Sequence, residues 1–498
     1  MNPRYQKSII IGLIIARYSY SNMKLFKKTN SLIFQFLLLF ILLVYSGCTK
    51  MVQVPEPINT ITASETFSND IYATSAIIGI YSKMSFNQNN QCFSNGSTTL
   101  YAGVSSDELS DIQGINDQFL HNDIQSNNGS LSGLFWQPAY FDIYMANAII
   151  EGLGASKTVS QAAKNQILGE AKFIRAFCYF YLTNLFGDVP LELSTDALQT
   201  AILPRAPQSV IYQQIIADLQ DAQNLLIQDY SLSNGEHIRA NKWAATALLA
   251  RVYLYLPQPN YSGADSAATA VINSGQFSLL SDLGGVFLKN SNEAILQLQT
   301  ISTHPNYITF EGLYFVPRNN KTNPTYFLTN QLLGAFEYGD QRRLFWVDST
   351  IFRGVTYYCP YKYKAGVTQE NAGNITEYYT LLRFAEQYLI RAEAKTEEGQ
   401  TTQAVDDLNV IRSRAGLAML STSLPKDSIL LAVAQERRIE LFAEWGHRWL
   451  DLKRWGTAVQ TLDTITNKTG YINSNSLLFP IPASEIQLDP NLTQNPGY

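Results

Sequence analysis

The sequence predicts a mostly α-helical protein with tetratricopeptide-like helical repeats and large irregular loop excursions. Apolar residues recur at three- and four-residue steps over many long segments, which is the period of an amphipathic helix. Two stretches, residues 91–132 and 278–377, interrupt this period and are rich in Asn, Gly, Ser or Tyr. Helix pairs of the lengths found around them can stack as tetratricopeptide-type units. A hydrophobic content of 46% in 498 residues fits a well-packed globular protein.

Six helices are expected before the second excursion, at residues 69–84, 135–153, 164–185, 209–226, 241–256 and 266–274. The first follows residues 62–66, whose hydroxyl groups can accept hydrogen bonds from the free N–H groups of a first helical turn. The third is the clearest because its apolar residues form one continuous stripe. This stripe consists of Ile167, Ala171, Ile174, Cys178, Tyr181 and Leu185. Gly187 and Pro190 end this helix, and Pro257 ends the fifth, since proline cannot continue a helix.

The second excursion contains short β-favouring pieces, of which residues 294–298 are the clearest. Helices are expected to return at residues 379–397, 402–414 and 428–445. Gly399 fits a turn between the first two of them. The tail, residues 477–498, is rich in Pro and Asn and is expected to be extended.

The N-terminal region predicts export with a lipid anchor. An apolar run over residues 32–44 follows basic residues and precedes Ser46-Gly47-Cys48, which is the pattern of a secretory signal. A Cys directly after Ser-Gly is typical of a lipobox, in which that Cys becomes the lipidated first residue. Tyr45 departs from the aliphatic residue usual at its position. The run is too short to span a bilayer, and its basic flanks, with no acidic residue before Glu56, argue against a core strand.

Residues 1–22 carry a second, shorter apolar stretch ahead of Met23. Because a complete signal begins at Met23, we interpret residues 1–22 as a misassigned upstream start and residues 23–47 as a lipoprotein signal peptide. Two tandem membrane segments are the less favoured alternative, since each stretch is too short to span. The mature chain is then residues 48–498.

Composition and motifs exclude several classes of function. The net charge is −5 and no long basic run follows the signal, which argues against nucleic acid as a partner. With Cys48 lipidated, Cys92, Cys178 and Cys359 remain, without a CxxC pair or a Cys/His cluster, so neither a disulfide framework nor a metal site is expected. We also expect no catalytic residues and no cofactor, because no HExxH, GxSxG, P-loop or GxGxxG motif occurs. A glycoside hydrolase, which needs two carboxylates across a cleft, stays open as an alternative.

A charged block near the C-terminus predicts ion pairs between packed helices. Glu436, Glu440 and Glu444 repeat at four-residue spacing, and arginines and tryptophans are interleaved with them and with Asp451. Charges among such bulky apolar residues are more often buried ion pairs than a catalytic acid and base.

An ordered set of sequence blocks resembles the SusD/RagB outer-membrane lipoproteins of Bacteroidetes. The blocks extend over the whole mature chain in family order, and the ordered set is specific although no single block is. They include Gly169–Phe177, Phe186–Leu191, Arg239–Lys242, Gly339–Arg343, Arg383–Ala394, Glu436–Arg438, Arg448–Trp455 and Gln494–Tyr498. The resemblance implies a single SusD-like domain over residues 48–498, with an N-terminal SusD-like part (48–230) and a C-terminal RagB/SusD part (231–498).

The resemblance also implies a function. The protein is expected to be a cell-surface nutrient-binding lipoprotein, held at the outer membrane by its lipid and facing the cell exterior. It would capture an oligosaccharide or polysaccharide and deliver it to a SusC-like TonB-dependent β-barrel transporter. The residues after Cys48 lack the acidic cluster that often marks surface export in this family. A peptide-capturing member of the same superfamily and a surface glycosidase are the alternatives.

The ligand is expected on the two excursions, since loops supply contacts on a rigid scaffold. Aromatic rings there would stack on sugar faces, and carboxylates or amides would bind hydroxyl groups. The candidate residues are Phe93, Tyr101, Asp107, Asp111, Asn116 and Phe119 in the first excursion and Tyr307, Phe310, Tyr314, Phe315 and Asn319 in the second. For each aromatic residue, local core packing is the competing interpretation.

Overall fold

The computed structural model describes residues 62–85, 91–112, 114, 116–300, 308–317, 325–366, 375–470 and 473–498. Within these ranges, Ala63–Tyr498 form one compact unit. Cys48 and the proposed start and signal, residues 1–22 and 23–47, lie outside the described residues, and the division at residue 230 stays a prediction. None of the helices in the described ranges is long and apolar enough to cross a membrane.

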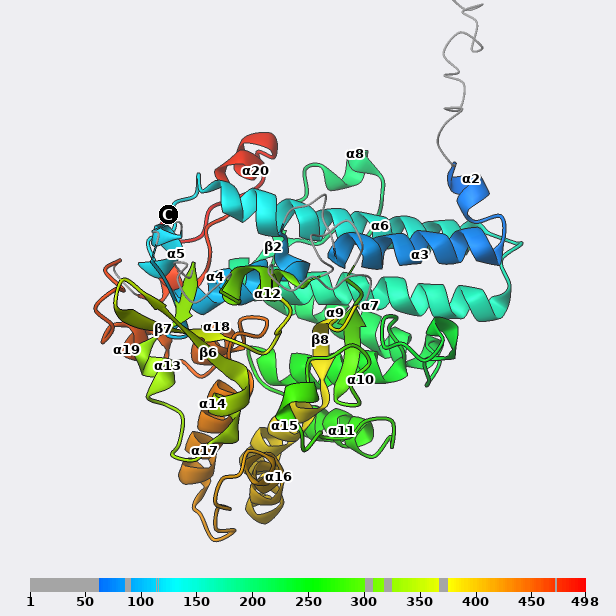
Figure 1. The fold of residues 1–498 in the computed structure, drawn as a ribbon. Coiled ribbons are helices and arrows are strands. Elements are labelled where there is room, and N and C mark those ends of the chain that lie inside the picture. The colour runs from blue at the N-terminus through cyan, green and yellow to red at the C-terminus, as the bar shows by residue number, and fades with distance from the viewer. Residues whose placement is uncertain are drawn as a thin grey trace, which may run out of the picture. The chain divides into compact units, whose positions relative to one another are not determined.

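The N-terminal helices are α2 (Ala63–Thr66), α3 (Asp70–Ser85), α6 (Gln137–Ala155), α7 (Gln161–Phe186) and α9 (Gln208–Leu225). The last four confirm the expected helices to within three residues, and each packs on the next, α3 on α6, α6 on α7 and α7 on α9 (Figure 1). The Ser160 side chain caps α7 by accepting a hydrogen bond from the Ala163 N–H at 3.4 Å. Gly187 ends α7 with φ 81°, a conformation that glycine adopts without strain.

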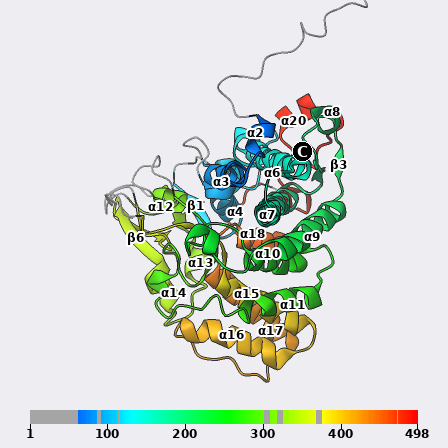
Figure 2. The same cartoon turned by 90° about the vertical axis from the view of Figure 1, so that its right-hand side faces the viewer.

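The series continues through α10 (Lys242–Tyr255), α11 (Tyr261–Ile272), α15 (Phe384–Glu397), α16 (Thr401–Arg414) and α17 (Lys426–Glu440). Again each helix packs on the next, so the helices before and after the second excursion form one stack. Figure 2 shows α3 and α6 at one end of the series and α16 and α17 at the other. α11 begins five residues before the predicted start because the Asn260 side chain caps it.

Shorter elements fill the two excursions and the C-terminal region. The helices are α4 (Ser97–Ser105), α5 (Asp117–Leu120), α8 (Ala197–Thr200), α12 (Phe310–Phe315), α13 (Asn330–Leu333), α14 (Gln341–Trp346), α18 (His447–Arg454), α19 (Ala458–Leu462) and α20 (Ala483–Leu488). A π-helical turn, Leu131–Trp136, leads into α6.

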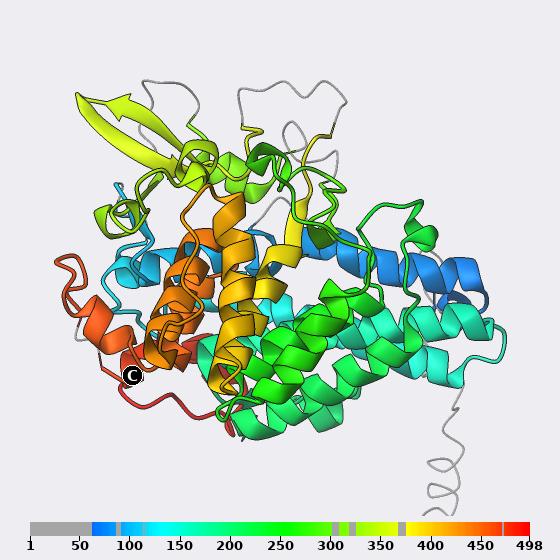
Figure 3. The same cartoon turned by 90° about the horizontal axis from the view of Figure 1, so that it is seen from below.

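Four antiparallel ladders of two strands each are described. They pair β1 (Leu109–Asp111) with β5 (Tyr326–Leu328), β2 (Val189–Pro190) with β3 (Arg205–Ala206), β4 (Ala294–Leu298) with β8 (Tyr379–Arg383), and β6 (Val347–Phe352) with β7 (Val355–Pro360). β4 confirms the strand expected at residues 294–298. The β6–β7 hairpin extends away from the helices on the side opposite α6, α7 and α9 (Figure 3).

Three element predictions were wrong. The first excursion is not irregular throughout, because α4 forms inside it; all nine residues of α4 are buried, so its sequence lacks the alternating faces that reveal a helix. Residues 379–383, expected as the start of a helix, form strand β8 because they pair with β4. The extended tail contains the short helix α20.

The end of α17 was also misplaced. The helix was expected to reach Trp445, yet it stops at Glu440. Ala443, Trp445 and Gly446 all have positive φ angles, of 48°, 49° and 67°. Such left-handed residues cannot continue a right-handed helix, and they turn the chain sharply into α18.

The predicted ion pairs between packed helices are confirmed. Glu440 of α17 accepts a hydrogen bond from Arg383 at 2.6 Å and lies 3.1 Å from Arg342 of α14. Asp451 of α18 binds Arg437 of α17 at 2.7 Å. All of these side chains are at most 3% exposed, so the charges are paired inside the core, as buried charges must be.

Candidate functional site

The two excursions meet in the ladder of β1 and β5. Asp111 stands opposite Tyr326 and Leu109 opposite Leu328. One residue beyond β5, the Thr329 N–H donates a hydrogen bond to the Glu108 carbonyl at 3.0 Å. The Thr329 hydroxyl donates to the Asp107 carbonyl. More than 200 residues of sequence separate these partners, so the ladder brings both predicted ligand-binding segments to one place.

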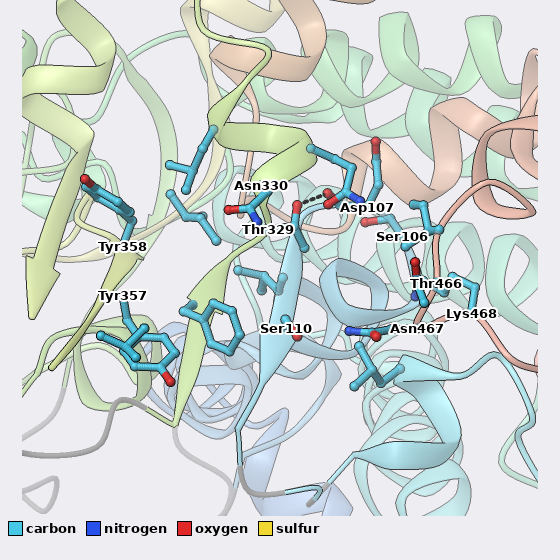
Figure 4. Close-up of a pocket in the computed structure, with 18 of the residues that line it drawn as sticks. Ser106, Asp107, Ser110, Thr329, Asn330, Tyr357, Tyr358, Thr466, Asn467 and Lys468 are labelled. Carbon is cyan, nitrogen blue, oxygen red and sulfur yellow. Dashed lines mark hydrogen bonds between the residues drawn. The ribbon is translucent and has the colours of Figure 1, made fainter. Parts of the chain in front are cut away.

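A cavity of 370 Å³ opens beside this ladder (Figure 4). β1 and β5 form one side of it, β7 a second and residues 465–468 a third, while the N-terminal turn of α13 lies between Asp107 and β7. In Figure 4, Tyr357 and Tyr358 lie at the β7 side and Asn467 and Lys468 at the opposite side. Elements from four distant parts of the chain therefore build the cavity, which we call the ladder pocket.

The ladder pocket is lined by polar side chains that form no hydrogen bond with any described residue. Tyr357 and Tyr358 are half-buried, and Asn330 and Asn467 are exposed. Within the part of the chain that the structure describes, none of these four side chains makes a hydrogen bond. The ring of Tyr357 also meets Phe327 edge-on, with centroids 5.1 Å apart, which fixes its orientation. Amide and phenol groups can each donate and accept hydrogen bonds, so the pocket can bind a ligand that is rich in hydroxyl groups.

Asp107 lies at one end of the ladder pocket and is held by two arginines. Its carboxylate accepts hydrogen bonds from Arg448 Nε at 2.7 Å and from Arg438 Nη2 at 2.6 Å. Burial raises the pKa of Asp107, but the hydrogen bond and charge of Arg448 and the charge of Arg438 outweigh it and lower the pKa overall. The predicted ligand contact Asp107 is thus at the site, with its oxygen atoms already bound.

Two further titratable groups lie close to Asp107. Burial, reinforced by the Asp107 charge, raises the pKa of Glu108 to about 8, so Glu108 is largely protonated at neutral pH. Lys468 lines the pocket and donates a hydrogen bond to the Val104 carbonyl. Burial lowers the pKa of Lys468 to about 7. The described residues hold no group of three His, Cys, Asp or Glu side chains that could bind a metal ion.

Four predicted aromatic contacts lie in the core instead of on a ligand surface. Phe93, Phe119, Phe310 and Phe315 are only 1–5% exposed. Phe119, for example, packs edge-on against the ring of Tyr101, with centroids 4.6 Å apart. A sugar cannot stack on a ring that other side chains cover, so these four residues act in packing.

Four further predicted residues do not line the ladder pocket but lie around Tyr326 of β5. Asp111 accepts hydrogen bonds from the backbone N–H groups of Gly114 and Asn116, both at 2.9 Å, and so shapes the loop after β1. Asn116 Nδ2 in turn donates to the Tyr326 hydroxyl at 2.6 Å. Asp111 and Asn116 are buried, whereas Tyr314, whose ring meets Tyr326 edge-on, is half-buried.

Tyr101 belongs to the same cluster and is buried, with its hydroxyl 3.3 Å from Ser130 Oγ. Burial, with smaller effects from Tyr314 and Asp111, raises the pKa of its phenol. Tyr307 and Asn319 lie outside the described residues and stay predictions.

Most residues of the ladder pocket were not predicted from the sequence. Tyr357 and Tyr358 carry one usable signal, since they lie in a run of β-favouring residues after the turn residues Arg353 and Gly354. Asn467 and Lys468 carry none, because only the tertiary fold brings them near the ladder.

Two family models match separate stretches of the chain. Residues 347–498 match the model described as "SusD family". Residues 56–254 match a second model, described as "Starch-binding associating with outer membrane".

Curated relatives and solved structures agree with these matches. SusD-like protein P38 of Formosa agariphila is 26% identical over 526 residues, covering 95% of this chain and 100% of the relative. The starch-binding protein SusD of Bacteroides thetaiotaomicron is 24% identical, covering 72% of this chain and 77% of the relative. A SusD superfamily structure from Parabacteroides distasonis superposes with a TM-score of 0.73 at 25% identity, covering 88% of this chain and all of the other. A laminarin-binding SusD-like protein gives a TM-score of 0.73 at 23% identity, covering 87% and 100%.

These matches confirm the predicted family and the predicted mostly helical fold. Of the proteins named above, one is named for binding starch and one for binding laminarin. The chain belongs to the SusD/RagB family.

Proposed function

We propose that this protein captures an oligosaccharide or polysaccharide and holds it in the ladder pocket. One observation supports the proposal most strongly. A 370 Å³ cavity is lined by half-buried rings and by amide and phenol groups that make no hydrogen bond with any described residue. That volume falls within the usual range of ligand sites. The apolar face of a sugar ring can lie on Tyr357 or Tyr358, and its hydroxyl groups can exchange hydrogen bonds with Asn330 and Asn467.

The names of relatives support a glycan as the ligand class. One related protein is named for binding starch and one structural neighbour for binding laminarin. Tyr314, on the neighbouring cluster, offers a further half-buried ring beside the loops that were predicted to bind. We include it in the proposed binding surface, with Asp111 and Asn116 shaping the loop next to it.

Binding without catalysis fits the charges in the ladder pocket best. Glycoside hydrolysis needs two carboxyl groups that flank the scissile bond. Among the described residues that line the pocket, Asp107 is the one carboxylate, and both of its oxygens bind arginines. A carboxylate engaged in this way is poorly placed to protonate a leaving group or attack a sugar. We therefore propose a binding protein and not an enzyme.

We further propose that lipid on Cys48 holds the protein at the outer membrane, facing the exterior, and that it delivers its ligand to a SusC-like TonB-dependent transporter. The signal pattern before Cys48 and the family's described association with the outer membrane support this placement. Palmitate labelling of cells expressing the full chain tests the anchor: label should enter the native protein and not Cys48→Ala. Equal labelling of the two would refute lipidation at this residue. Co-purification of one β-barrel transporter with the native protein, reproduced by cross-linking in intact cells, would support the proposed partner.

The ligand class can be tested by isothermal titration of the chain lacking residues 1–48. Polysaccharides, oligosaccharides and peptides would be titrated in parallel, and each sample would then be analysed for products. Saturable binding of a glycan that is recovered intact is the expected result. Binding of peptides alone would favour a peptide-capturing member of the superfamily, and a cleaved glycan would overturn the proposal that the protein is not an enzyme.

A further inference from the structure

Cations outnumber anions around the ladder pocket. Asp107 has two arginine partners, Arg438 and Arg448, so this group of three keeps one positive charge. Glu108, the next carboxyl group in the chain, is buried, and its Oε2 accepts a hydrogen bond from the Ala443 N–H at 3.3 Å. The whole chain has a net charge of −5, so the positive charge at the proposed binding site is opposite in sign to that of the protein as a whole.

Lys468 adds a cation that has no carboxylate partner. Its side chain lines the pocket, is 9% exposed, and donates to the Val104 carbonyl. In the described ranges, no carboxylate oxygen lies within 4.0 Å of its Nζ. The negative charge that acts on Lys468 is that of Asp107, whose carboxylate is already paired with the two arginines. An ammonium group has three protons to donate, so Lys468 keeps donor capacity for a ligand.

Arg343 supplies a second cation at the β7 side. Its guanidinium carbon lies 5.7 Å from the centre of the Tyr358 ring, and its Nη1 donates to the Leu333 carbonyl at 2.8 Å; both Tyr358 and Leu333 line the pocket. Arg343 is exposed and forms no ion pair with any described residue. Lys468 thus lines one side of the pocket, and Arg343, which does not itself line the pocket, contacts two lining residues, Tyr358 and Leu333.

We propose that the ladder pocket selects glycans that carry an anionic group, either the carboxylate of a uronic acid or a sulfate ester, with Lys468 and Arg343 as the charges that bind it. This inference rests on the proposed function, since it names the substrate class of the same pocket. An anionic sugar would neutralise the excess charge without displacing any ion pair of the protein, and a partly buried cation attracts it more strongly than a fully solvated one. Uronates and sulfate esters share this chemistry.

Because Lys468 can lose its proton, the affinity of the pocket for an anionic glycan should depend on pH. Groups that face Lys468 or adjoin its segment are Asp107, Glu108, Arg438, Arg448 and His121, whose Nδ1 lies 2.5 Å from the Asn467 carbonyl oxygen. Because burial lowers the pKa of Lys468 to about 7, the free protein loses this charge as the pH rises above neutrality. Affinity for an anionic glycan should therefore fall between pH 6 and pH 8.5, while affinity for a neutral glycan should stay flat.

Matched pairs of ligands test the proposal in titrations of the chain lacking residues 1–48. Dextran against dextran sulfate tests sulfate, and polygalacturonate oligosaccharides against their reduced, neutral counterparts test carboxylate. At low salt we expect the anionic member of at least one pair to bind about tenfold more tightly, since a hydrogen bond to a charged group contributes on the order of 1.5 kcal/mol. The pair that shows the preference identifies the anionic group: sulfate for the dextrans and carboxylate for the galacturonate oligosaccharides.

The variants Lys468→Met and Arg343→Gln should each remove much of that preference for the anionic member. Lys468→Met should also weaken the pH dependence of that preference, and the part that remains reports Glu108, whose pKa burial raises to about 8. Lys426→Met, at an exposed ion pair with Glu397 on another part of the molecule, is the matched control and should change nothing. Arg343 is exposed, so its variant tests the proposal even if Lys468→Met fails to fold.

Tighter binding of neutral members, or a preference that survives both substitutions, would overturn the inference while leaving glycan capture intact. Absence of binding to every glycan, neutral or anionic, would instead overturn the proposed function and this inference with it.

Discussion

Asp107, at the end of the ladder pocket, is bound through both carboxylate oxygens by Arg448, with Nε to Oδ1 at 2.7 Å and Nη2 to Oδ2 at 3.0 Å. Arg448 belongs to α18, at the opposite end of the sequence from Asp107. The pair therefore links the first excursion to the C-terminal helices, and Arg438 of α17 joins it. The edge of the proposed binding site depends on a charge contact with the helical scaffold.

Replacing Asp107 with Ala should destabilise the protein by about 3 kcal/mol, because it leaves two largely buried arginines without an anion. Urea unfolding followed by circular dichroism would measure the change. Asp221→Ala is the matched control: its partner Lys172 forms a surface pair in which Asp221 is 54% exposed. The control should cost at most about 1 kcal/mol. Equal losses in the two variants would show that burial of the Asp107 contact has no energetic consequence.

Alanine substitutions at two glycines with nearly equal φ angles should distinguish the free-energy cost of backbone strain from that of a steric clash. Gly446 has φ 67° and Gly456 φ 68°. A Cβ on Gly446 would lie 2.5 Å from the Cβ of Ala102, whereas one on Gly456 would meet nothing within 4 Å. Gly456→Ala should cost about 1–2 kcal/mol from left-handed strain, and Gly446→Ala about 1–3 kcal/mol more from overpacking. Thermal unfolding of both variants would check this difference, and similar melting temperatures would contradict the packing of α18 against α4.

Acid should destabilise the folded protein by protonating Glu386. Its Oε2 lies 2.6 Å from Nη2 of Arg251. Burial raises the pKa of Glu386, but the charges of Arg251 and His447 and the hydrogen bond from Arg251 outweigh it and lower the pKa to about 2. A depressed carboxylate pKa stabilises the folded state above the unfolded value near 4.5, and this contribution is lost as the pH falls towards 2. It amounts to about 3 kcal/mol.

The free energy of unfolding of the native protein and of Glu386→Gln, measured from pH 6 to pH 3, would test this. The variant should be less stable at pH 6 and the gap should narrow as the pH falls below about 4.5. A gap that stays constant over this range would refute the depressed pKa of Glu386.

Local sequence predicted the fold where each helix has one buried face. The stripe from Ile167 to Leu185 is an example, and α7 follows it closely. The same reasoning failed at α4, which is buried on every side, and at residues 379–383, whose pairing with β4 depends on a strand more than 80 residues away. Turns such as that at Ala443 arise from contacts that periodicity does not encode.

The candidate site was predictable to a smaller extent. Composition located the two excursions, and Asp107 does line the ladder pocket. Aromatic rings such as Phe93 and Phe119, however, are equally suited to a core and to a sugar, and the fold placed them in the core. Tyr357 and Lys468 meet at the pocket only because β7 and residues 465–468 are brought together across the ladder.

The most direct test of glycan capture in the ladder pocket is to compare two variants in titrations with the glycan that binds the native protein. Tyr357→Ala combined with Tyr358→Ala should weaken binding by about tenfold or more, since each ring contributes about 1 kcal/mol. Tyr338→Ala removes a fully exposed tyrosine that does not line the pocket and should bind like the native protein. If the double variant keeps native affinity while folded, the glycan binds elsewhere and the central claim is wrong.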